Sequence, residues 1–107
     1  MNSLAEALSS VEIETVRQAL KATVEGSFFP DWEFETLIGV DRDTVRRVCE
    51  AWPRLTVDQD EFICAVVGSM NNLVGYPHGK EEELALYIPE GRAAINKTLQ
   101  RLTSLGI

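Results

Sequence analysis

Few residues in this chain have the chemical character that catalysis needs. One histidine, His78, and two cysteines, Cys49 and Cys64, occur in 107 residues. Nucleophilic catalysis requires an activated serine, cysteine or lysine beside a base, and His78 is the only imidazole available for that role. Both cysteines fall on the apolar side of a predicted helix, where a thiol behaves as a small hydrophobic group. We therefore expect the protein not to be an enzyme.

Metal and cofactor sites are also poorly supported. A zinc site needs several converging ligands, and the chain has no Cys-x-x-Cys pair. Asp58, Asp60 and Glu61 have the spacing of a calcium loop, but the glycine of its sharp turn is missing. No glycine-rich phosphate loop occurs either. We expect no metal and no cofactor; a disulfide between Cys49 and Cys64 stays open, although a cytosolic compartment disfavours it.

Net charge is the strongest functional signal. The chain has 10 basic and 17 acidic residues, which give a formal charge of −7. Such a field repels nucleic acid at long range and favours a basic protein partner. Four arginines nevertheless lie close together in the sequence: Arg42, Arg46, Arg47 and Arg54. A helix-turn-helix built on them would place Asp58, Asp60 and Glu61 against the phosphates. We expect no nucleic-acid partner, and we expect the arginines to form a solvated face with Asp41, Asp43 and Glu50.

The expected location is cytoplasmic, without a membrane partner. The longest stretch without a charge, residues 62–79, is too short and too polar to span a bilayer. The first ten residues contain Glu6 and no basic residue, unlike a secretion signal.

Apolar residues at helical spacing predict an all-α fold. Their pattern gives helices over residues 10–25, 31–38, 42–52, 58–74 and 80–88, and a last helix that follows a break at Pro89 and Gly91 and runs to about Leu105. No segment alternates with the period of a strand. The predicted fold is an irregular bundle of five or six short helices around a central helix near residues 57–75, with residues 1–107 forming a single domain.

Capping residues mark the predicted helix ends. Ser9 and Glu12 have the spacing of a capping box, and Asp31 and Asp41 are expected to cap the two helices that follow. Gly26 is expected to end the first helix in the left-handed conformation.

Two features are candidates for a binding site. The loop around Tyr76 and His78 gathers a phenol and an imidazole between Gly75 and Gly79; its alternative role is purely structural, with Tyr76 on the core and His78 capping the next helix. The second feature is the acidic surface, although Glu81 and its neighbours also complement a helix dipole. The expected partner-binding residues are Trp32, Glu33, Glu35, Asp58, Asp60, Glu61, Tyr76, His78, Glu81 and Glu82.

Three short motifs resemble those of small uncharacterised bacterial helical proteins. They are Trp52-Pro53, Asn71-Asn72-Leu73 and the run from Gly75 to Gly79, within residues 37–88. In size and acidity the chain also resembles immunity proteins of contact-dependent growth inhibition and related toxin systems. That resemblance is one of type and carries no residue across.

The expected function is therefore that of an immunity-type inhibitor. It binds a basic toxin domain, for which a nuclease is the expected class, and blocks the substrate surface of that domain with carboxylates. Trp32, between Asp31 and Glu33, and Tyr76 are the expected anchors. The alternative is a regulatory or structural interaction module without a toxin partner, which forms a homo-oligomer through an apolar helix face.

Overall fold

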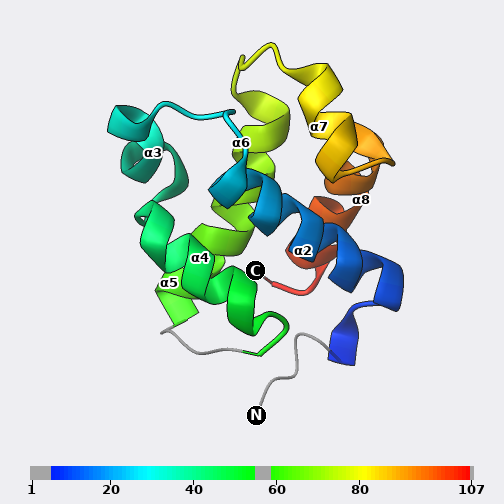
Figure 1. Ribbon diagram of the computed structural model, residues 1–107. Helices are drawn as coiled ribbons and strands as arrows, with labels where there is room; N and C mark the ends of the chain where they lie inside the picture. The colour runs from blue at the N-terminus through cyan, green and yellow to red at the C-terminus, as the bar shows by residue number, and fades with distance from the viewer. Residues whose placement is uncertain (1–5, 55–58, 107) are drawn as a thin grey trace.

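The computed structural model describes residues 6–54 and 59–106, and the ordered elements in these ranges are all helical. The predicted all-α bundle is confirmed. The elements are α2 (Ser10–Glu25), α3 (Asp31–Ile38), α4 (Arg42–Ala51), α5 (Gln59–Ile63), η1 (Cys64–Gly68), α6 (Ser69–Gly75), α7 (Glu81–Tyr87) and α8 (Gly91–Ser104) (Figure 1). None of these helices is long and apolar enough to cross a bilayer.

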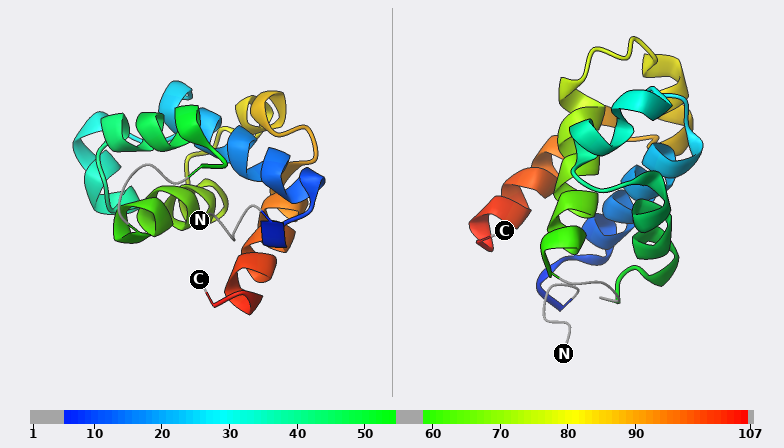
Figure 2. Two further views of the ribbon diagram at one scale, coloured as in Figure 1. Left: turned by 90° about the horizontal axis from the view of Figure 1, so that it is seen from below. Right: turned by 90° about the vertical axis from the view of Figure 1, so that its left-hand side faces the viewer.

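The predicted central helix consists of α5, η1 and α6, which follow one another without a break over residues 59–75. At 1.5 Å per residue this helix is about 25 Å long. It lies between α8 and α4 when the molecule is seen from the side (Figure 2, right). Helix α2 shares the central position, because it contacts α4, α7 and α8 as well as η1 and α6.

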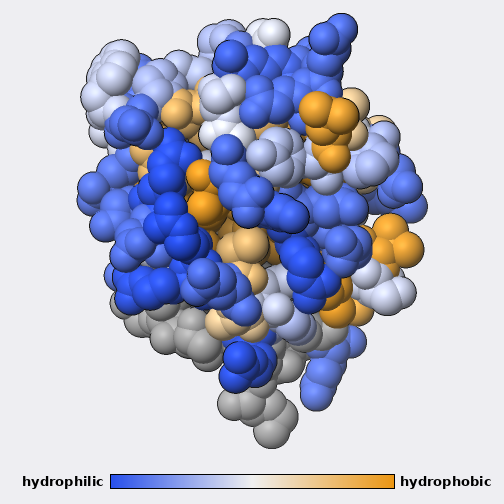
Figure 3. Space-filling view, in the orientation of Figure 1, coloured by the Kyte–Doolittle hydropathy of each residue, from blue (hydrophilic) through white to orange (hydrophobic). Residues whose placement is uncertain are grey.

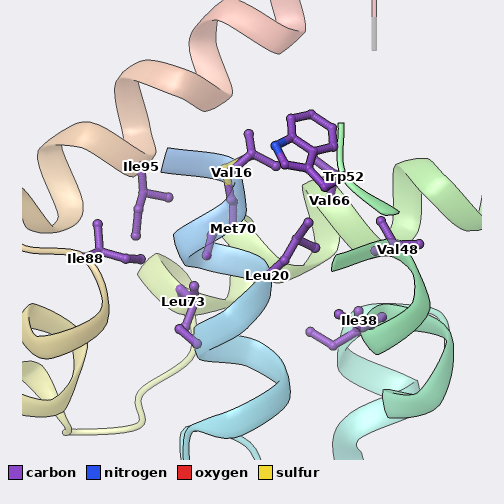
Figure 4. Close-up of a cluster of buried hydrophobic side chains, with 14 of the residues drawn as sticks. Val16, Leu20, Ile38, Val48, Trp52, Val66, Met70, Leu73, Ile88 and Ile95 are labelled. Atoms are coloured by element: carbon purple, nitrogen blue, oxygen red, sulfur yellow. The ribbon is translucent and has the colours of Figure 1, made fainter. Parts of the chain in front are cut away.

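The core lies where these two helices meet their neighbours (Figure 4). Val16 and Leu20 of α2 are buried against Val66, Met70 and Leu73 of the central helix. The predicted apolar stripe of α4 is confirmed: Val45, Val48 and Trp52 are buried and Cys49 is half-buried. The Trp52 ring stacks on Phe62 with centroids 5.8 Å apart, and its Nε1–H donates to the carbonyl oxygen of Ile13 at 2.9 Å.

The middle of the central helix is a single π-helical turn, η1, which the sequence pattern did not predict. At Gly68 an added Cβ would collide with the carbonyl oxygen of Ile38, so α3 ends directly against this turn. Asn72 closes the junction, because its Nδ2 donates to the carbonyl oxygens of Leu37 and Gly68, at 2.8 Å each. Glycine at position 68 therefore sets how closely α3 approaches the central helix.

Two of the predicted helix caps are confirmed and two are wrong. The Ser9–Glu12 capping box forms, and Asp41 Oδ1 accepts from the Thr44 amide at 2.8 Å. Gly26, however, has extended backbone; glycine is required there because a Cβ would lie 2.6 Å from the carbonyl oxygen of Ala22. Asp31 is not the cap of α3, since Pro30 holds that position and Asp31 begins the first turn.

Both cysteines are free, so the disulfide left open above does not form. Cys49 and Cys64 are half-buried. Burial is the main cause that raises the pKa of the Cys49 thiol, which disfavours the nucleophilic thiolate.

Candidate partner-binding site

The indole of Trp32 is the largest exposed apolar group at the start of α3. Trp32 is 80% exposed. The side chains on either side of it are both engaged: Asp31 Oδ1 pairs with a guanidinium nitrogen of Arg42 at 2.9 Å, and Glu33 Oε1 accepts from the hydroxyl of Tyr76 at 3.0 Å. Trp32 is thus held outward on a braced helix end. We call Asp31, Trp32, Glu33 and Glu35, with the supporting Arg42 and Tyr76, the Trp32 platform.

Arg42 fixes this platform to the rest of the fold. Its Nη1 donates to the carbonyl oxygens of Thr23 and Val24 at 3.0 Å each, which satisfies two groups at the open end of α2. Its guanidinium carbon lies 4.3 Å from the centroid of the Phe34 ring. The arginine therefore ties the end of α2 to the start of α3.

The sequence-based expectation for the arginines is corrected here. Arg42 binds Asp31 and backbone carbonyls, not Asp41, Asp43 or Glu50, because it lies at the junction of three helices. Arg46 does form the expected solvated pair with Asp43, at 2.7 Å.

The loop over residues 76–80, which we call the 76–80 loop, packs against the connector between α2 and α3. The Tyr76 ring meets Phe29 edge to face with centroids 5.6 Å apart, and the His78 ring meets Phe28 in the same way at 4.9 Å. The hydrogen bond to the Glu33 carboxylate is the main cause that raises the pKa of the Tyr76 phenol. This loop supports the Trp32 platform through the contact between Tyr76 and Glu33.

His78 closes the end of the central helix. Its Nδ1 accepts from the Lys80 amide at 2.9 Å, and its Nε2 lies 3.0 Å from the carbonyl oxygen of Leu73 in the last turn of α6. Gly79, with φ of +68°, supplies the turn that brings the Lys80 amide back to the ring. These contacts are structural, but they differ from the expected cap of the next helix, because no side chain that the structure describes makes a cap hydrogen bond to α7.

A shallow hollow of about 760 Å³ lies between the α2–α3 connector and the 76–80 loop. Its charged lining is mixed rather than acidic, because it contains Arg42 and Lys80 as well as Glu25 and Asp31. His78 and Tyr76 also line it, yet both are already hydrogen-bonded to protein groups. The hollow therefore shows no cluster of open polar groups around which a substrate would be organised.

The glutamates at the start of α7 differ in what they contact. Glu81 binds the Arg92 guanidinium through both oxygens, at 2.9 and 2.6 Å, and the resulting hydrogen bonds lower the pKa of the Glu81 carboxyl. Glu83 accepts from the amide and hydroxyl of Ser27, which lowers its pKa too. Glu82 is exposed and has no ion pair with any residue that the structure describes.

The predicted surface is not one continuous face. Asp60 and Glu61 lie on α5, at the opposite end of the central helix from the 76–80 loop (Figure 1). That separation is about the length of the helix, roughly 25 Å. Asp58 lies outside the described residues. Of the predicted residues, Trp32, Glu33, Glu35 and Tyr76 belong to the Trp32 platform, and His78 lies in the 76–80 loop that supports it. Glu81 and Glu82 follow directly after this loop, at the start of α7.

Sequence reasoning missed two participants, Arg42 and Ser27, and one exposed apolar residue on another helix, Leu86. Arg42 and Ser27 act through partners that are distant in sequence, for which no local pattern exists. Leu86 on α7 is 83% exposed, which its position between Leu84 and Tyr87, on a different side of the helix, could have indicated. Across the part of the chain that the structure describes, no group of three or more His, Cys, Asp or Glu residues is placed to hold a metal ion.

No protein-family model, no curated protein and no solved structure matches this chain.

Proposed function

We propose that the protein is an immunity-type inhibitor that binds a basic protein through the Trp32 platform. The observation that carries the proposal is the outward indole of Trp32, 80% exposed on a helix end braced by Arg42 and Tyr76. Tryptophan is among the residues that most often dominate binding energy, and a helix end that is braced before binding loses less conformational entropy on contact.

Charge indicates the kind of partner. The side chain of Asp31 is 94% exposed although it pairs with Arg42, and Glu35 has no ion pair among the residues described. These carboxylates lie next to the indole in a chain of net charge −7. A partner that has an apolar pocket surrounded by positive charge would fit both the indole and the carboxylates. The opposite charges of the two proteins would also speed their association.

The specific partner class that we propose is a nuclease domain of a bacterial toxin. Such a domain presents a basic surface to the phosphates of its substrate. Carboxylates of the Trp32 platform would occupy phosphate positions on that surface and exclude the substrate. Inhibition therefore follows from binding, without any reaction on this chain.

Two charge reversals test the proposal. Glu35→Lys changes the Trp32 platform, whereas Glu90→Lys changes the net charge equally at the start of α8, on the other side of the molecule (Figure 1). The tagged wild-type protein and both variants are used to capture partners from the native host. The captured protein is then identified, purified and assayed for nuclease activity in the presence of each form.

We expect wild type and Glu90→Lys to capture and inhibit the same basic protein. We expect Glu35→Lys to associate with it about tenfold more slowly at low ionic strength, with a smaller difference at high salt. Equal association rates of the two variants, or a captured partner that is acidic, would contradict the proposal.

The alternative, a homo-oligomeric interaction module, has one supporting observation. Leu86 on α7 and Val11 on α2 are 83% and 64% exposed, away from the Trp32 platform. Figure 3 shows the apolar side chains of one face as separate spots among polar ones, rather than as a broad apolar surface. Stable dimers bury larger apolar patches, so we prefer the inhibitor. Sedimentation of the purified protein distinguishes a monomer from an oligomer.

A further inference from the structure

Both ring nitrogens of His78 contact the backbone. The Lys80 amide lies 2.9 Å from Nδ1, and the carbonyl oxygen of Leu73 lies 3.0 Å from Nε2. An amide N–H can only donate and a carbonyl can only accept. Nδ1 must therefore carry the lone pair and Nε2 the hydrogen. The fold selects one neutral tautomer of this imidazole.

A second proton on the ring cannot be accommodated in this arrangement. The imidazolium carries hydrogens on both nitrogens, so its Nδ1–H would face the N–H of Lys80 and that hydrogen bond would be lost. We propose that His78 is a pH-sensitive latch: protonation of its imidazole releases the 76–80 loop and loosens the Trp32 platform.

Charged groups on the loop itself and on four neighbouring helices face this imidazole or the hollow that it lines. They are Lys80 of the loop, Glu81 and Glu83 of α7, Glu25 of α2, Asp31 beside it on α3, and Arg42 of α4. The nearest carboxylates, those of Glu81 and Glu83, attract an imidazolium. The cation thus gains attraction toward α7 when it loses the Lys80 amide, so the loop has two alternative arrangements.

Contacts along the loop connect the latch to the platform. The His78 amide donates to the carbonyl oxygen of Tyr76 at 2.8 Å, and the hydroxyl of Tyr76 holds Glu33. The His78 ring also packs on Phe28, in the connector that leads into α3. Movement of the His78 ring therefore affects both the hydrogen bond from Tyr76 to Glu33 and the packing of Phe28 in the α2–α3 connector.

The consequence for binding rests on the proposed function. Protonation adds a positive charge beside the platform and removes part of its support. A basic partner would be held more weakly in mild acid than at neutral pH for both reasons.

The latch itself can be tested without any partner, because His78 is the only histidine in the chain. Nuclear magnetic resonance of the full-length protein follows the ring nitrogens and the backbone amides from about pH 8 to about pH 5, a range in which an imidazole titrates. We expect the Lys80 amide shift to follow the ring titration, and the exchange protection of that amide to fall about tenfold or more after correction for intrinsic exchange. The amides of Tyr76 and Glu33 should follow in the same range.

Two variants separate the latch from a general effect of acid. His78→Asn keeps a side-chain oxygen that can accept from the amide two residues on, but it cannot become charged. We expect its Lys80 amide to stay protected over the whole range. His78→Phe keeps a ring against Phe28 and has no acceptor, so its Lys80 amide should be unprotected at every pH.

A Lys80 amide that does not respond while the His78 ring titrates would overturn the proposal. So would the same pH dependence in His78→Asn as in wild type. These outcomes are independent of the inhibitor function, because they are measured on the isolated protein. Failure to capture a basic partner would refute only the inhibitor function, whereas a Lys80 amide that ignores the His78 titration would refute only the latch.

Discussion

Tyr76 and Glu33 are 43 positions apart in the sequence, yet the phenol of one donates to the carboxylate of the other at 3.0 Å. This hydrogen bond joins the 76–80 loop to α3 immediately beside Trp32. Arg42 makes a second connection to the start of α3, through Asp31. The exposed indole is therefore presented by two contacts that bring together three separate parts of the chain.

The Tyr76 contact predicts an alkaline titration. Because the Glu33 hydrogen bond raises the pKa of the Tyr76 phenol in the folded protein, its contribution to folding is complete below the ordinary tyrosine pKa. That contribution is lost as the pH rises through the raised value. In a Tyr87→Phe background, absorbance of the phenolate should report Tyr76 alone, and adding Glu33→Gln should move its midpoint to lower pH. An unchanged midpoint would show that the carboxylate does not hold the phenol.

The Glu81–Arg92 pair predicts the opposite behaviour in acid. Arg92 lowers the pKa of Glu81 below its ordinary value of 4.5, so the stabilisation is present above that value and disappears as the pH falls through the lowered one. Glu81→Gln should therefore reduce thermal stability at neutral pH and have little effect in strong acid. Glu82→Gln, at an exposed neighbouring position, is the matched control. Equal melting temperatures for the two variants at neutral pH would count against the pair.

Trp52 predicts a large core effect. Its side chain is buried, stacks on Phe62 and donates to Ile13, so Trp52→Ala removes packing and a hydrogen bond together. We expect the free energy of unfolding in urea to fall by about 3–5 kcal/mol. Trp32→Ala, which removes an exposed indole, should change it by less than about 0.5 kcal/mol. A loss below about 1 kcal/mol at Trp52 would mean that α4 does not pack as described.

Gly68 predicts a steric limit between α3 and the central helix. An added Cβ there would collide with the backbone carbonyl of Ile38, which cannot rotate away as a side chain could. Gly68→Ala should therefore cost about 1–3 kcal/mol in urea unfolding, despite the better helix propensity of alanine. At Gly75, the last residue of α6, a Cβ meets nothing within 4 Å, so Gly75→Ala is the control and should be neutral or stabilising. Similar losses in both variants would show that the close approach is not the cause.

Local patterns in the sequence were sufficient for much of the fold. The stripe of α4, the Ser9–Glu12 capping box and the Asp41 cap each depend on residues within one or two turns, and all three are confirmed. The errors at Gly26 and Asp31 occurred at the α2–α3 connector. There, contact with the Phe28 ring and the fixed backbone of Pro30 decided the conformation.

The candidate site was only partly predictable for the same reason. Exposure of Trp32 was suggested by its acidic neighbours, but its supports involve Arg42 and Tyr76, which are 11 and 43 positions from the residues they bind. The close approach of α3 to Gly68, in the π-helical turn η1, is likewise a contact between segments distant in sequence. Asp60 and Glu61 seemed to belong with the other carboxylates because net charge contains no information about position.

The affinity of Trp32→Ala for the captured basic protein tests the central claim most directly. Leu86→Ala is the matched control, because Leu86 is as exposed as Trp32 and lies on α7. We predict that Trp32→Ala weakens binding by about 2 kcal/mol or more, roughly thirtyfold in Kd, and that Leu86→Ala leaves it unchanged. Equal affinities of wild type and Trp32→Ala, with both proteins folded, would contradict the account.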